Sequence, residues 1–512
     1  MSDLSHSPVQ LVWFKRDLRV NDHEALVEAA KRGPTVALYI YEPELYEAPD
    51  FDPSHLEFVN ECLRELQANL RALGSELFLE VGEAVSILES IHQRFGIGAL
   101  HSHQETGGTL SFQRDLRVKD WASSNGIPWH EYRQHGVTRG LRDRDGWAAR
   151  WTSLMKAPPL APPPYIESAE VELRSTVLPL RDLELQPRNR SVFQRGGEQK
   201  AGSLLHSFLQ ERGERYQKEM SSPNTNIEAC SRLSPHFAYG SISMRTVYHA
   251  TEERRLELKA RRAEKIPIGP DWLRSLSSFS KRLRWHCHFI QKLESQPSIE
   301  FENIARAYDG LRENDFSQAR FQAWCEGRTG YPMVDACMRS LVATGWVGFR
   351  MRAMLMSFAS YHLWLHWRPT SVFLARQFID FEPGIHYSQA QMQSGTTGIN
   401  TVRIYSPTKQ VHDHDPKGAF IRSWVPELAG VPDEHIAEPH LMGGLTQRQS
   451  GCIIGKDYPA PLVEHKEAVR EARSKIYSVR STAAAREEAQ RVYQKHGSRR
   501  RPARRANKRK AS

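Results

Sequence analysis

The chain has 512 residues, 39% of them hydrophobic, with 12 Trp, 16 Tyr and 20 Phe, which fits a folded protein of two or three domains. No run approaches the roughly 18 to 20 apolar residues of a membrane span, and the polar start MSDLSHSPVQLVWFKRD does not resemble a secretory signal. The six cysteines form no CxxC pair, which argues against a zinc ribbon or a disulfide framework and favours the reducing cytoplasm.

The positive charge is concentrated at the C-terminal end. The formal charge is +10, and the segment from Lys495 carries nine Lys or Arg and no acid. Removing those nine charges leaves about +1 for the rest of the chain. We expect residues 481–512 to form a basic, disordered tail that attracts polyanions such as nucleic acid. A solubilising terminus is the alternative.

Residues 10–135 alternate short apolar runs with amphipathic stretches. The runs QLVWF, TVALYIY, ELFLEV, GALHSH and PWHEY are separated by helical patterns at 24–31, 56–73, 84–94 and 110–121. This alternation predicts βαβ units and a parallel sheet, so we expect a Rossmann-like α/β domain over residues 1–150. The turn after the first run reads WFKRDLRVND and lacks GxGxxG, so dinucleotide binding is not expected there.

The pattern changes after Lys156. The segment KAPPLAPPPYIES is too rich in proline for a helix or sheet, which predicts an extended linker over residues 151–200. From Ala201 apolar residues recur at helical spacing, so we expect a helical domain over residues 201–480. Between Asp380 and Gln410 the chain is rich in Gly, Ser, Thr and Asn, which predicts a loop that lines a polar ligand.

Two places combine polar groups with apolar surroundings. The segment CSRLSPHFAYGSIS from Cys230 puts hydroxyls before a helix start, where backbone N–H groups can bind a phosphate; a simple helix cap is the alternative. Arg352 and Asp380 lie on apolar segments. Because burying single charges is costly, they are expected to pair with each other or with a polar ligand.

Four segments carry a family resemblance. LVWFKRDLRVNDHEAL at Leu11, SRLSPHFAYGSIS at Ser231, WCEGRTGYPMVDACMRSLVATGW at Trp324 and RIYSPTKQ at Arg403 resemble, in the same order, signature segments of the photolyase and cryptochrome family. The resemblance extends to about Leu428. It implies an antenna-type α/β domain followed by a helical FAD-binding domain.

The resemblance also implies a set of FAD contacts. Arg352 and Asp380 match the pair that faces the isoalloxazine ring, where an arginine fixed by a carboxylate places a positive charge beside the reduced flavin. Cys230 stands where a Thr or Ser is usual. The other expected FAD contacts are Tyr216, Ser231, Leu233, Ser234, Phe279, Arg282, His286 and Glu382.

The expected catalytic residues are Trp285, Arg282, Phe349 and Trp367. Trp285 matches an aromatic residue that lines the substrate cavity, and we expect Phe279 and Arg282 to share its helix face. In repair enzymes of the family a Glu, an Asn and a Met usually stand at Arg282, Phe349 and Ala353, where they contact a flipped pyrimidine dimer. Their replacement leaves groups of the lesion unpaired, at about 1 to 3 kcal/mol each.

The family's chain of three electron-donating tryptophans is incomplete. Trp367 matches the middle member, whereas Asn314 stands at the distal position and the interval FEPGIHYSQAQMQSGTTGINTV contains no tryptophan. Tyr387 is an oxidisable ring in that same interval.

Other cofactors are less strongly implied. HSHQETGG at His101 resembles the strand end where some relatives hold a folate or deazaflavin antenna, with Glu105 as a candidate contact. Relatives with an iron–sulfur cluster hold it with cysteines late in the helical domain. Cys452 is the only cysteine after Cys337, so we expect no cluster, and we expect no other metal.

Two functions follow from the resemblance. The first is a light-driven DNA photolyase, in which reduced FAD gives an electron to a damaged pyrimidine pair, with UV-damaged DNA as partner and single-stranded DNA as one form of it. The second is a cryptochrome-like blue-light receptor without repair. A flavin-binding structural protein is a third alternative. We favour the photolyase, as a cytoplasmic monomer.

Overall fold

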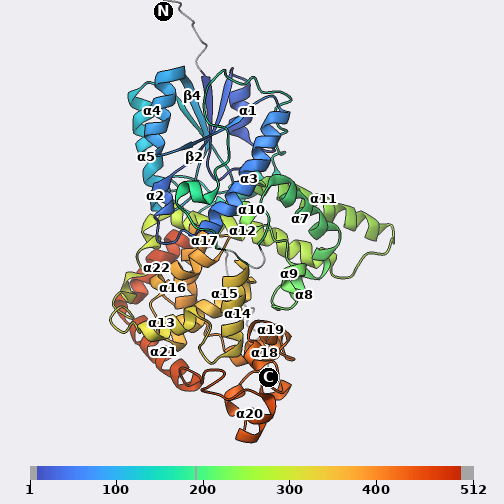
Figure 1. Ribbon diagram of the computed structural model, residues 1–512, viewed down its shortest axis with the longest axis vertical. Coiled ribbons are helices and arrows are strands. Elements are labelled where there is room, and N and C mark those ends of the chain that lie inside the picture. Colours follow the sequence, from blue (N-terminus) through green and yellow to red (C-terminus); the bar gives the residue numbers. More distant parts are fainter. Residues whose placement is uncertain (1–8, 189, 191–192, 498–512) are drawn as a thin grey trace, which may run out of the picture.

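The protein consists of an N-terminal domain built on a sheet and a larger helical domain (Figure 1). The computed structural model describes residues 9–188, 190 and 193–497. All the named strands lie before residue 133, and the chain from residue 198 onward is helical, which confirms the predicted fold class. Within the described residues, none of the helices is both long enough and apolar enough to cross a membrane.

The sheet is parallel and has five strands in the order β3-β2-β1-β4-β5. Side chains alternate along β1, so that Leu11 and Trp13 pack on one face and Val12 and Phe14 on the other. Helices cover both faces, as a buried parallel sheet requires. The strands are β1 (Val9–Phe14), β2 (Thr35–Tyr41), β3 (Leu77–Val81), β4 (Ile97–His103) and β5 (Trp129–Tyr132). The helices of this domain are α1 (Glu24–Ala30), α2 (Pro43–Tyr46), α3 (Pro53–Ala72), α4 (Ala84–Phe95) and α5 (Thr109–Ser124).

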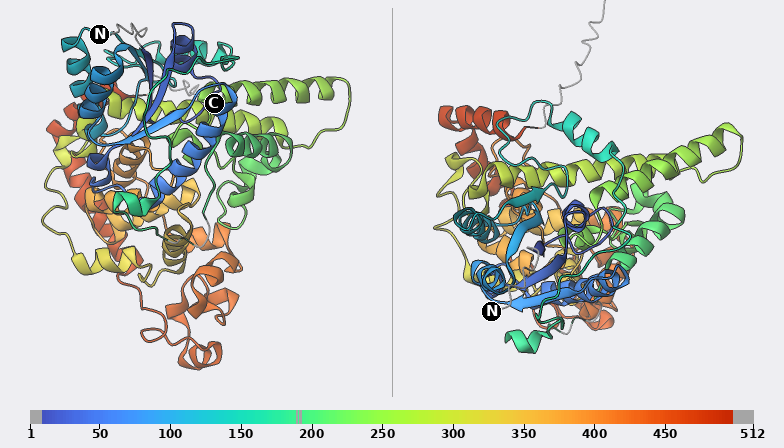
Figure 2. Two further views of the ribbon diagram at one scale, coloured as in Figure 1. Left: turned by 45° about the horizontal axis from the view of Figure 1, so that its top comes forward. Right: turned by 90° about the horizontal axis from the view of Figure 1, so that it is seen from above.

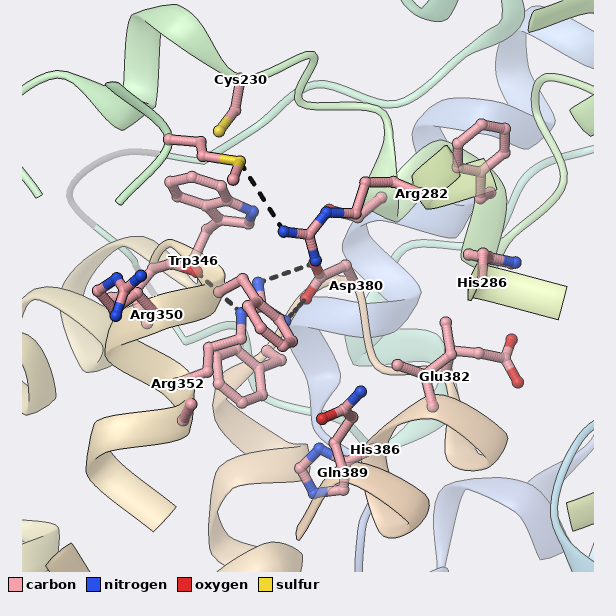
Figure 3. A pocket seen from close by; sticks show the side chains of 18 of the residues that line it. Cys230, Arg282, His286, Trp346, Arg350, Arg352, Asp380, Glu382, His386 and Gln389 are labelled. Carbon is pink, nitrogen blue, oxygen red and sulfur yellow. Dashed lines mark hydrogen bonds and ion pairs between the residues drawn. The ribbon is translucent and has the colours of Figure 1, made fainter. Parts of the chain in front are cut away.

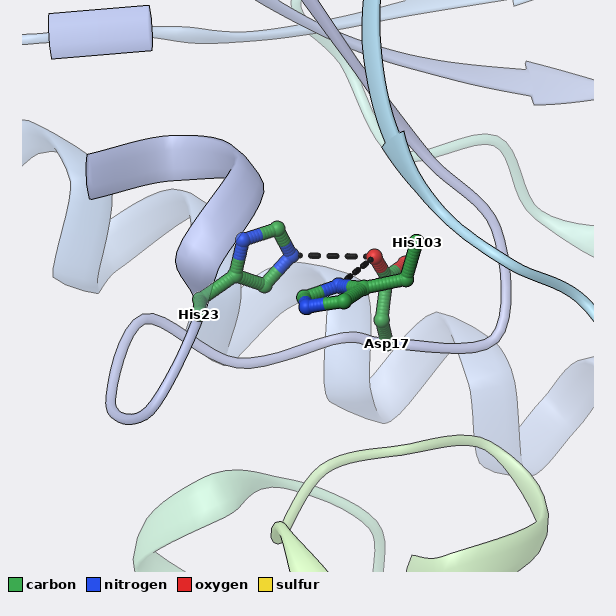
Figure 4. A group of neighbouring side chains, drawn as sticks. All are labelled: Asp17, His23 and His103. Atoms are coloured by element: carbon green, nitrogen blue, oxygen red, sulfur yellow. Dashed lines mark hydrogen bonds and ion pairs between the residues drawn. The ribbon is translucent and has the colours of Figure 1, made fainter. Parts of the chain in front are cut away.

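The turn after β1 is held by a buried carboxylate (Figure 4). Asp17 Oδ2 lies 3.0 Å from His23 Nε2 and 2.8 Å from His103 Nδ1. Burial opposes its charge, yet the two imidazoles hold the pKa of Asp17 well below its usual range, so the carboxylate accepts and both rings donate. Leu26 N–H donates to the other nitrogen of His23, which fixes that tautomer. These hydrogen bonds fix the orientation of both rings around the carboxylate.

Arg16, in the same turn, forms hydrogen bonds to the helical domain. Its Nε donates to the carbonyl of Ala238 at 2.7 Å and its Nη2 to that of Phe381 at 2.8 Å. Nη2 also lies 3.8 Å from the carboxylate of Glu382. The two domains are therefore joined by polar contacts close to residues expected to bind the cofactor.

The connection between the domains is shorter than expected. Helix α6 (Trp147–Lys156) runs past residue 151, and the extended segment begins only after it. One 3₁₀ turn, Leu180–Leu183, interrupts this segment before α7 (Glu198–Gln210). Helix α6 therefore occupies residues 151–156, which the predicted linker included.

The helical domain packs around α14 (Pro332–Thr344), α15 (Phe349–Ser357) and α16 (Trp367–Gln377), whose apolar side chains form its largest core cluster. Helix α11 (Met244–Ala263) packs against α12, and its C-terminal end projects from the helical domain (Figures 1 and 2). The other helices are α8 (Tyr216–Glu219), α9 (Asn226–Ala229), α10 (Ser234–Ala238), α12 (Trp272–Ser295), α13 (Gln318–Cys325), α17 (Pro383–Ser394), α18 (Pro407–His414), α19 (Ala419–Trp424), α20 (Gly444–Ser450), α21 (His465–Arg480) and α22 (Ala483–His496). A π-helical turn, Phe358–His362, follows α15.

Two sequence predictions need correction here. The expected loop between Asp380 and Gln410 is mostly helical, because Pro383 starts α17 at a position where its missing N–H costs nothing. The expected disordered tail is also wrong for Ala483–His496, which form α22 with Thr482 as N-cap. Residues 498–512 lie outside the described part of the chain.

Candidate functional site

The helical domain encloses a cavity of about 480 Å³ (Figure 3). Its walls come from α10 and the segment before it, from α12 and α15, and from one face of α17 along its whole length. The predicted residues that line it are Tyr216, Ser231, Leu233, Ser234, Phe279, Arg282, His286, Phe349, Arg352, Asp380 and Glu382. Residues from widely separated motifs thus meet in one space.

The expected ion pair is bidentate. Arg352 Nη1 and Nη2 donate to the two carboxylate oxygens of Asp380 at 3.0 and 2.8 Å. Arg352 Nε donates to the carbonyl of Val347, and its guanidinium lies 4.0 Å from the ring centroid of Phe378. Burial opposes ionisation of Asp380, but Arg352 holds its pKa below the usual range. The carboxylate is therefore charged at neutral pH, and it fixes the arginine at the cavity wall.

Three arginines that are not among the predicted FAD contacts also line the cavity: Arg232, Arg350 and Arg403. Arg232 has a left-handed backbone, with φ of 62°, which is uncommon for a residue with a Cβ and is found at functional sites. Its guanidinium lies 3.9 Å from the ring centroid of Trp346, another lining residue. Burial lowers the pKa of Arg232 to about 10, so it still carries its charge at neutral pH. The sequence does contain an indication of Arg232 and Arg350, because each is a charged residue within a largely apolar motif.

Several buried polar atoms on the cavity wall have no hydrogen-bond partner among the described residues. They are Arg232 Nη1, His286 Nδ1, Arg350 Nε, Glu382 Oε1 and Gln389 Oε1. Leaving a buried polar group unpaired costs about 1 to 3 kcal/mol, and native structures contain few such groups. Five of them line this one cavity, where a polar ligand can supply the partners.

The cavity also has more positive than negative charge. Burial lowers the pKa of His286 to about 3 and that of His386 to about 4, so both rings are neutral. Burial raises the pKa of Glu382 to about 7, against the opposing effect of Arg16, so this carboxyl is partly protonated near neutrality. The lining arginines thus face mainly one full negative charge, that of Asp380. This balance favours an anionic ligand.

Arg282 and Phe349 lie together on the cavity wall. The guanidinium of Arg282 lies 5.3 Å from the ring centroid of Phe349, and its Nη2 lies 3.9 Å from the sulfur of Met220. Phe349 is 47% exposed, so this pair forms part of the opening to solvent. Ala353 lines the cavity behind it.

Trp285 does not line the cavity, so the predicted helix face shared by Phe279 and Trp285 is wrong. Each residue of an α-helix turns by about 100°, and six residues therefore place Trp285 well away from the direction of Phe279. Arg282 and His286 keep that direction and line the cavity. The Trp285 ring is 41% exposed and packs at 5.7 Å on Phe289.

Trp367 also lies outside the cavity wall. Its side chain is fully buried at the start of α16, and its Nε1 donates to Asn303 Oδ1 at 2.7 Å. Its ring centroid lies 6.3 Å from that of Tyr387 on α17. Trp367 is thus separated from the cavity by the residues of α17.

The antenna candidate Glu105 lines a second cavity of about 400 Å³ between the two domains. Glu105 Oε2 forms an ion pair with Arg114 at 2.6 Å. Carboxyl groups also line this space at Asp115, Glu131, Glu294 and Glu300, with Trp129 and Phe112 as its aromatic residues.

Comparisons with known proteins agree with this architecture. Two family models match the chain, the description "DNA photolyase" over residues 10–140 and "FAD binding domain of DNA photolyase" over residues 279–478. A cryptochrome DASH of Gloeobacter violaceus is 27% identical over 482 residues, which covers 89% of this chain and 93% of the relative. A deoxyribodipyrimidine photo-lyase of Alkalihalophilus pseudofirmus is also 27% identical, with coverage of 91% and 97%. The crystal structure of a class III photolyase from Agrobacterium tumefaciens superposes with a TM-score of 0.80 at 26% identity, covering 94% of this chain and all of that one.

Proposed function

Because the chain belongs to the photolyase and cryptochrome family, we propose that it binds FAD and repairs UV-damaged DNA in blue light, as a deoxyribodipyrimidine photolyase-type lyase. The observation that carries this proposal is the set of unpartnered polar atoms around an arginine-rich cavity. FAD has a diphosphate for the arginines and a polar ring edge for the remaining donors and acceptors. The match of the FAD-binding family model to residues 279–478 supports the same cofactor.

Different residues of the cavity would contact different parts of the cofactor. Ser231, Leu233 and Ser234 would hold the diphosphate, and Arg352 would face the flavin ring with its charge fixed by Asp380. When bound, reduced and excited by blue light, FAD supplies the electron that splits a damaged pyrimidine pair. Glu382 and His286 would orient the polar edge of the ring.

The opening of the cavity fits a nucleotide brought out of its stack. Phe349 offers an exposed ring on which a base can stack, and Arg282 offers a charge that can pair with a phosphate. Extrusion costs least in single-stranded or damaged DNA. The basic segment 498–512 would add salt-dependent affinity for the phosphate backbone.

One observation favours a cryptochrome-like receptor as the second candidate. Arg282 packs on Phe349 at the opening, in place of the acid and amide that usually contact a dimer. A receptor needs the flavin but no room for a lesion. The equal identity to a named cryptochrome and a named photo-lyase gives the two roles similar weight.

The second cavity is where we propose that an antenna chromophore would bind. Its aromatic residues can stack on a planar ring, and Glu105 and Glu300 can accept hydrogen bonds from ring N–H groups. The check is extraction of the purified protein with acid, followed by absorbance and fluorescence of the released chromophores. FAD without a second chromophore contradicts an occupied antenna site.

The test of the main proposal uses protein purified in the dark and a UV-irradiated oligothymidylate. After incubation with a thiol reductant in blue light or darkness, recovery of thymine absorbance in the light alone supports a photolyase. Bound flavin that photoreduces without recovery supports the receptor. A chain that binds no flavin contradicts both. The variant Arg282→Glu tests the opening, since unchanged lesion binding would exclude Arg282 from recognition.

A further inference from the structure

Tyr387 on α17 lies one layer behind the cavity wall and is fully buried. Its phenol donates a hydrogen bond of 2.5 Å to Asp50 Oδ2, a residue of the N-terminal domain that lies between α2 and α3. Such short O–H···O distances are typical of bonds to an ionised carboxylate. Burial, and then the nearby charge of Asp50, raise the pKa of Tyr387, so the proton stays on the phenol in the resting protein.

The surroundings of Tyr387 connect this hydrogen bond to the cavity. Its ring centroid lies 5.3 Å from that of His386 and 6.1 Å from that of Phe381, and both of these residues line the cavity. On the other side Trp367 lies 6.3 Å away. A ligand in the cavity is thus separated from Tyr387 by a single layer of side chains.

From this geometry we propose that Tyr387 is an electron donor to the flavin and that Asp50 takes its proton. The proposal rests on the flavin binding proposed above. In the step, Tyr387 gives one electron to the photoexcited oxidised flavin while its phenolic proton moves to Asp50 Oδ2, which leaves a neutral tyrosyl radical. A thiol in solution returns the electron to Tyr387, and Asp50 returns the proton.

Arg368 explains why the electron and proton should move together. Its guanidinium lies 5.0 Å from the ring centroid of Tyr387, and its Nη1 donates to the phenol oxygen at 3.3 Å. Loss of an electron alone would create a cation beside this charge, which is electrostatically unfavourable. Transfer of the proton to Asp50 leaves the ring neutral and removes that cost.

Other oxidisable rings at the cavity are less suited. Tyr216 and Tyr405 line it, but within the described chain neither phenol is hydrogen-bonded to a carboxylate that could take its proton. Trp346 also lines it, and Arg232 lies 3.9 Å from its ring centroid, where a positive charge opposes oxidation of the indole. Tyr387 combines proximity to the cavity with a proton acceptor.

The test compares flavin-loaded wild type with Tyr387→Phe and Asp50→Asn. Each protein is illuminated with blue light and dithiothreitol, and the loss of the oxidised-flavin band is followed in H₂O and in D₂O. Tyr387→Phe should slow the bleaching at least about tenfold, and Asp50→Asn, which keeps an acceptor but no base, should slow it by a similar factor. Wild type should bleach more slowly in D₂O, and illumination of frozen samples should give the electron paramagnetic resonance signal of a tyrosyl radical.

The matched control is Tyr458→Phe. Tyr458 donates a 2.6 Å hydrogen bond to Asp335, and both residues are buried, but neither lines the cavity. This variant should bleach like wild type. Equal rates in wild type and Tyr387→Phe, or the absence of a solvent isotope effect in wild type, would overturn the role of Tyr387. If Tyr387→Phe fails to fold, Asp50→Asn and the isotope effect decide. A wild-type protein without flavin contradicts instead the proposed function.

Discussion

Two regions of the molecule bury several charges, and they do so differently. At the sheet, where the strand order reverses between β1 and β4, Arg114 pairs with Glu42 and with Glu105 at 2.6 Å each, and Lys15 pairs with Asp115 at 3.2 Å. All five side chains are less than 10% exposed. An α/β sheet commonly binds its ligand at such a switch point. Here the protein's own charges fill part of that space and satisfy one another.

The cavity of the helical domain is the opposite case. Arg352 is paired with Asp380, but within the described part of the chain one polar atom each of Arg232, Arg350 and Glu382 has no hydrogen-bond partner. Buried charges that are mutually satisfied serve the fold, whereas buried polar atoms left without partners indicate a ligand. On this basis we assign the charges at the sheet to the fold and propose those of the cavity for cofactor binding.

The largest expected effect lies in the sheet domain. Arg114→Met removes the partner of Glu42 and Glu105, and breaking a buried pair in this way costs about 3 to 5 kcal/mol. The free energy of unfolding, measured by urea denaturation, should fall by that amount. The flavin content per folded chain should stay at the wild-type level, and its loss would contradict the assignment of these charges to the fold.

Arg352→Met should show the reverse pattern. The flavin loses a charged partner worth about 3 kcal/mol, so its affinity should fall about a hundredfold. The unfolding free energy of the flavin-free protein should change by less than about 2 kcal/mol, because water in the cavity can replace the partner of Asp380. Fluorescence titration with FAD measures the first quantity and urea denaturation the second. An unchanged affinity would contradict the placement of Arg352 at the cofactor.

The pH dependence of the free energy of unfolding should reveal the protonation of Glu382. Burial raises its pKa from 4.5 to about 7, so the folded state holds this proton more tightly than the unfolded state does. The stability that the proton contributes is complete below pH about 4.5 and is lost as the pH rises through about 7. Flavin-free wild type should therefore lose about 2 to 3 kcal/mol more than Glu382→Gln between these pH values, as measured by urea denaturation. Parallel curves for the two proteins would rule out the buried carboxyl as the cause.

The smallest expected effect concerns Cys230. Burial raises the pKa of its thiol to about 11, so the cavity wall carries a neutral SH group, a weak hydrogen-bond donor. Cys230→Ser supplies a stronger donor of similar shape and should tighten FAD binding by about 0.5 to 1.5 kcal/mol. The titration used for Arg352→Met measures this change, and weaker binding would show that the hydroxyl finds no acceptor.

Much of this architecture could be predicted from the sequence. The alternation of apolar runs and helical patterns predicts the order of strands and helices, and the ten cofactor contacts predicted from the motifs all line the cavity. The position predicted for Trp285 is wrong because two successive spacings of three residues do not return to the same side of an α-helix. Each spacing falls about 60° short of a full turn, so Trp285 points about 120° away from Phe279. The sequence prediction does not include helix α22, because the dense positive charge that follows this helix is typical of a disordered tail. Partner atoms come from distant segments, so no local pattern showed which buried groups were unsatisfied.

The crystal structure of the complex with FAD tests the central claim most directly. The account predicts one FAD in the helical cavity, with polar atoms within hydrogen-bond distance of Arg232 Nη1, Arg350 Nε and Glu382 Oε1, and the Arg352–Asp380 pair retained. FAD bound elsewhere, or FAD in the cavity that leaves these atoms without partners, would contradict it.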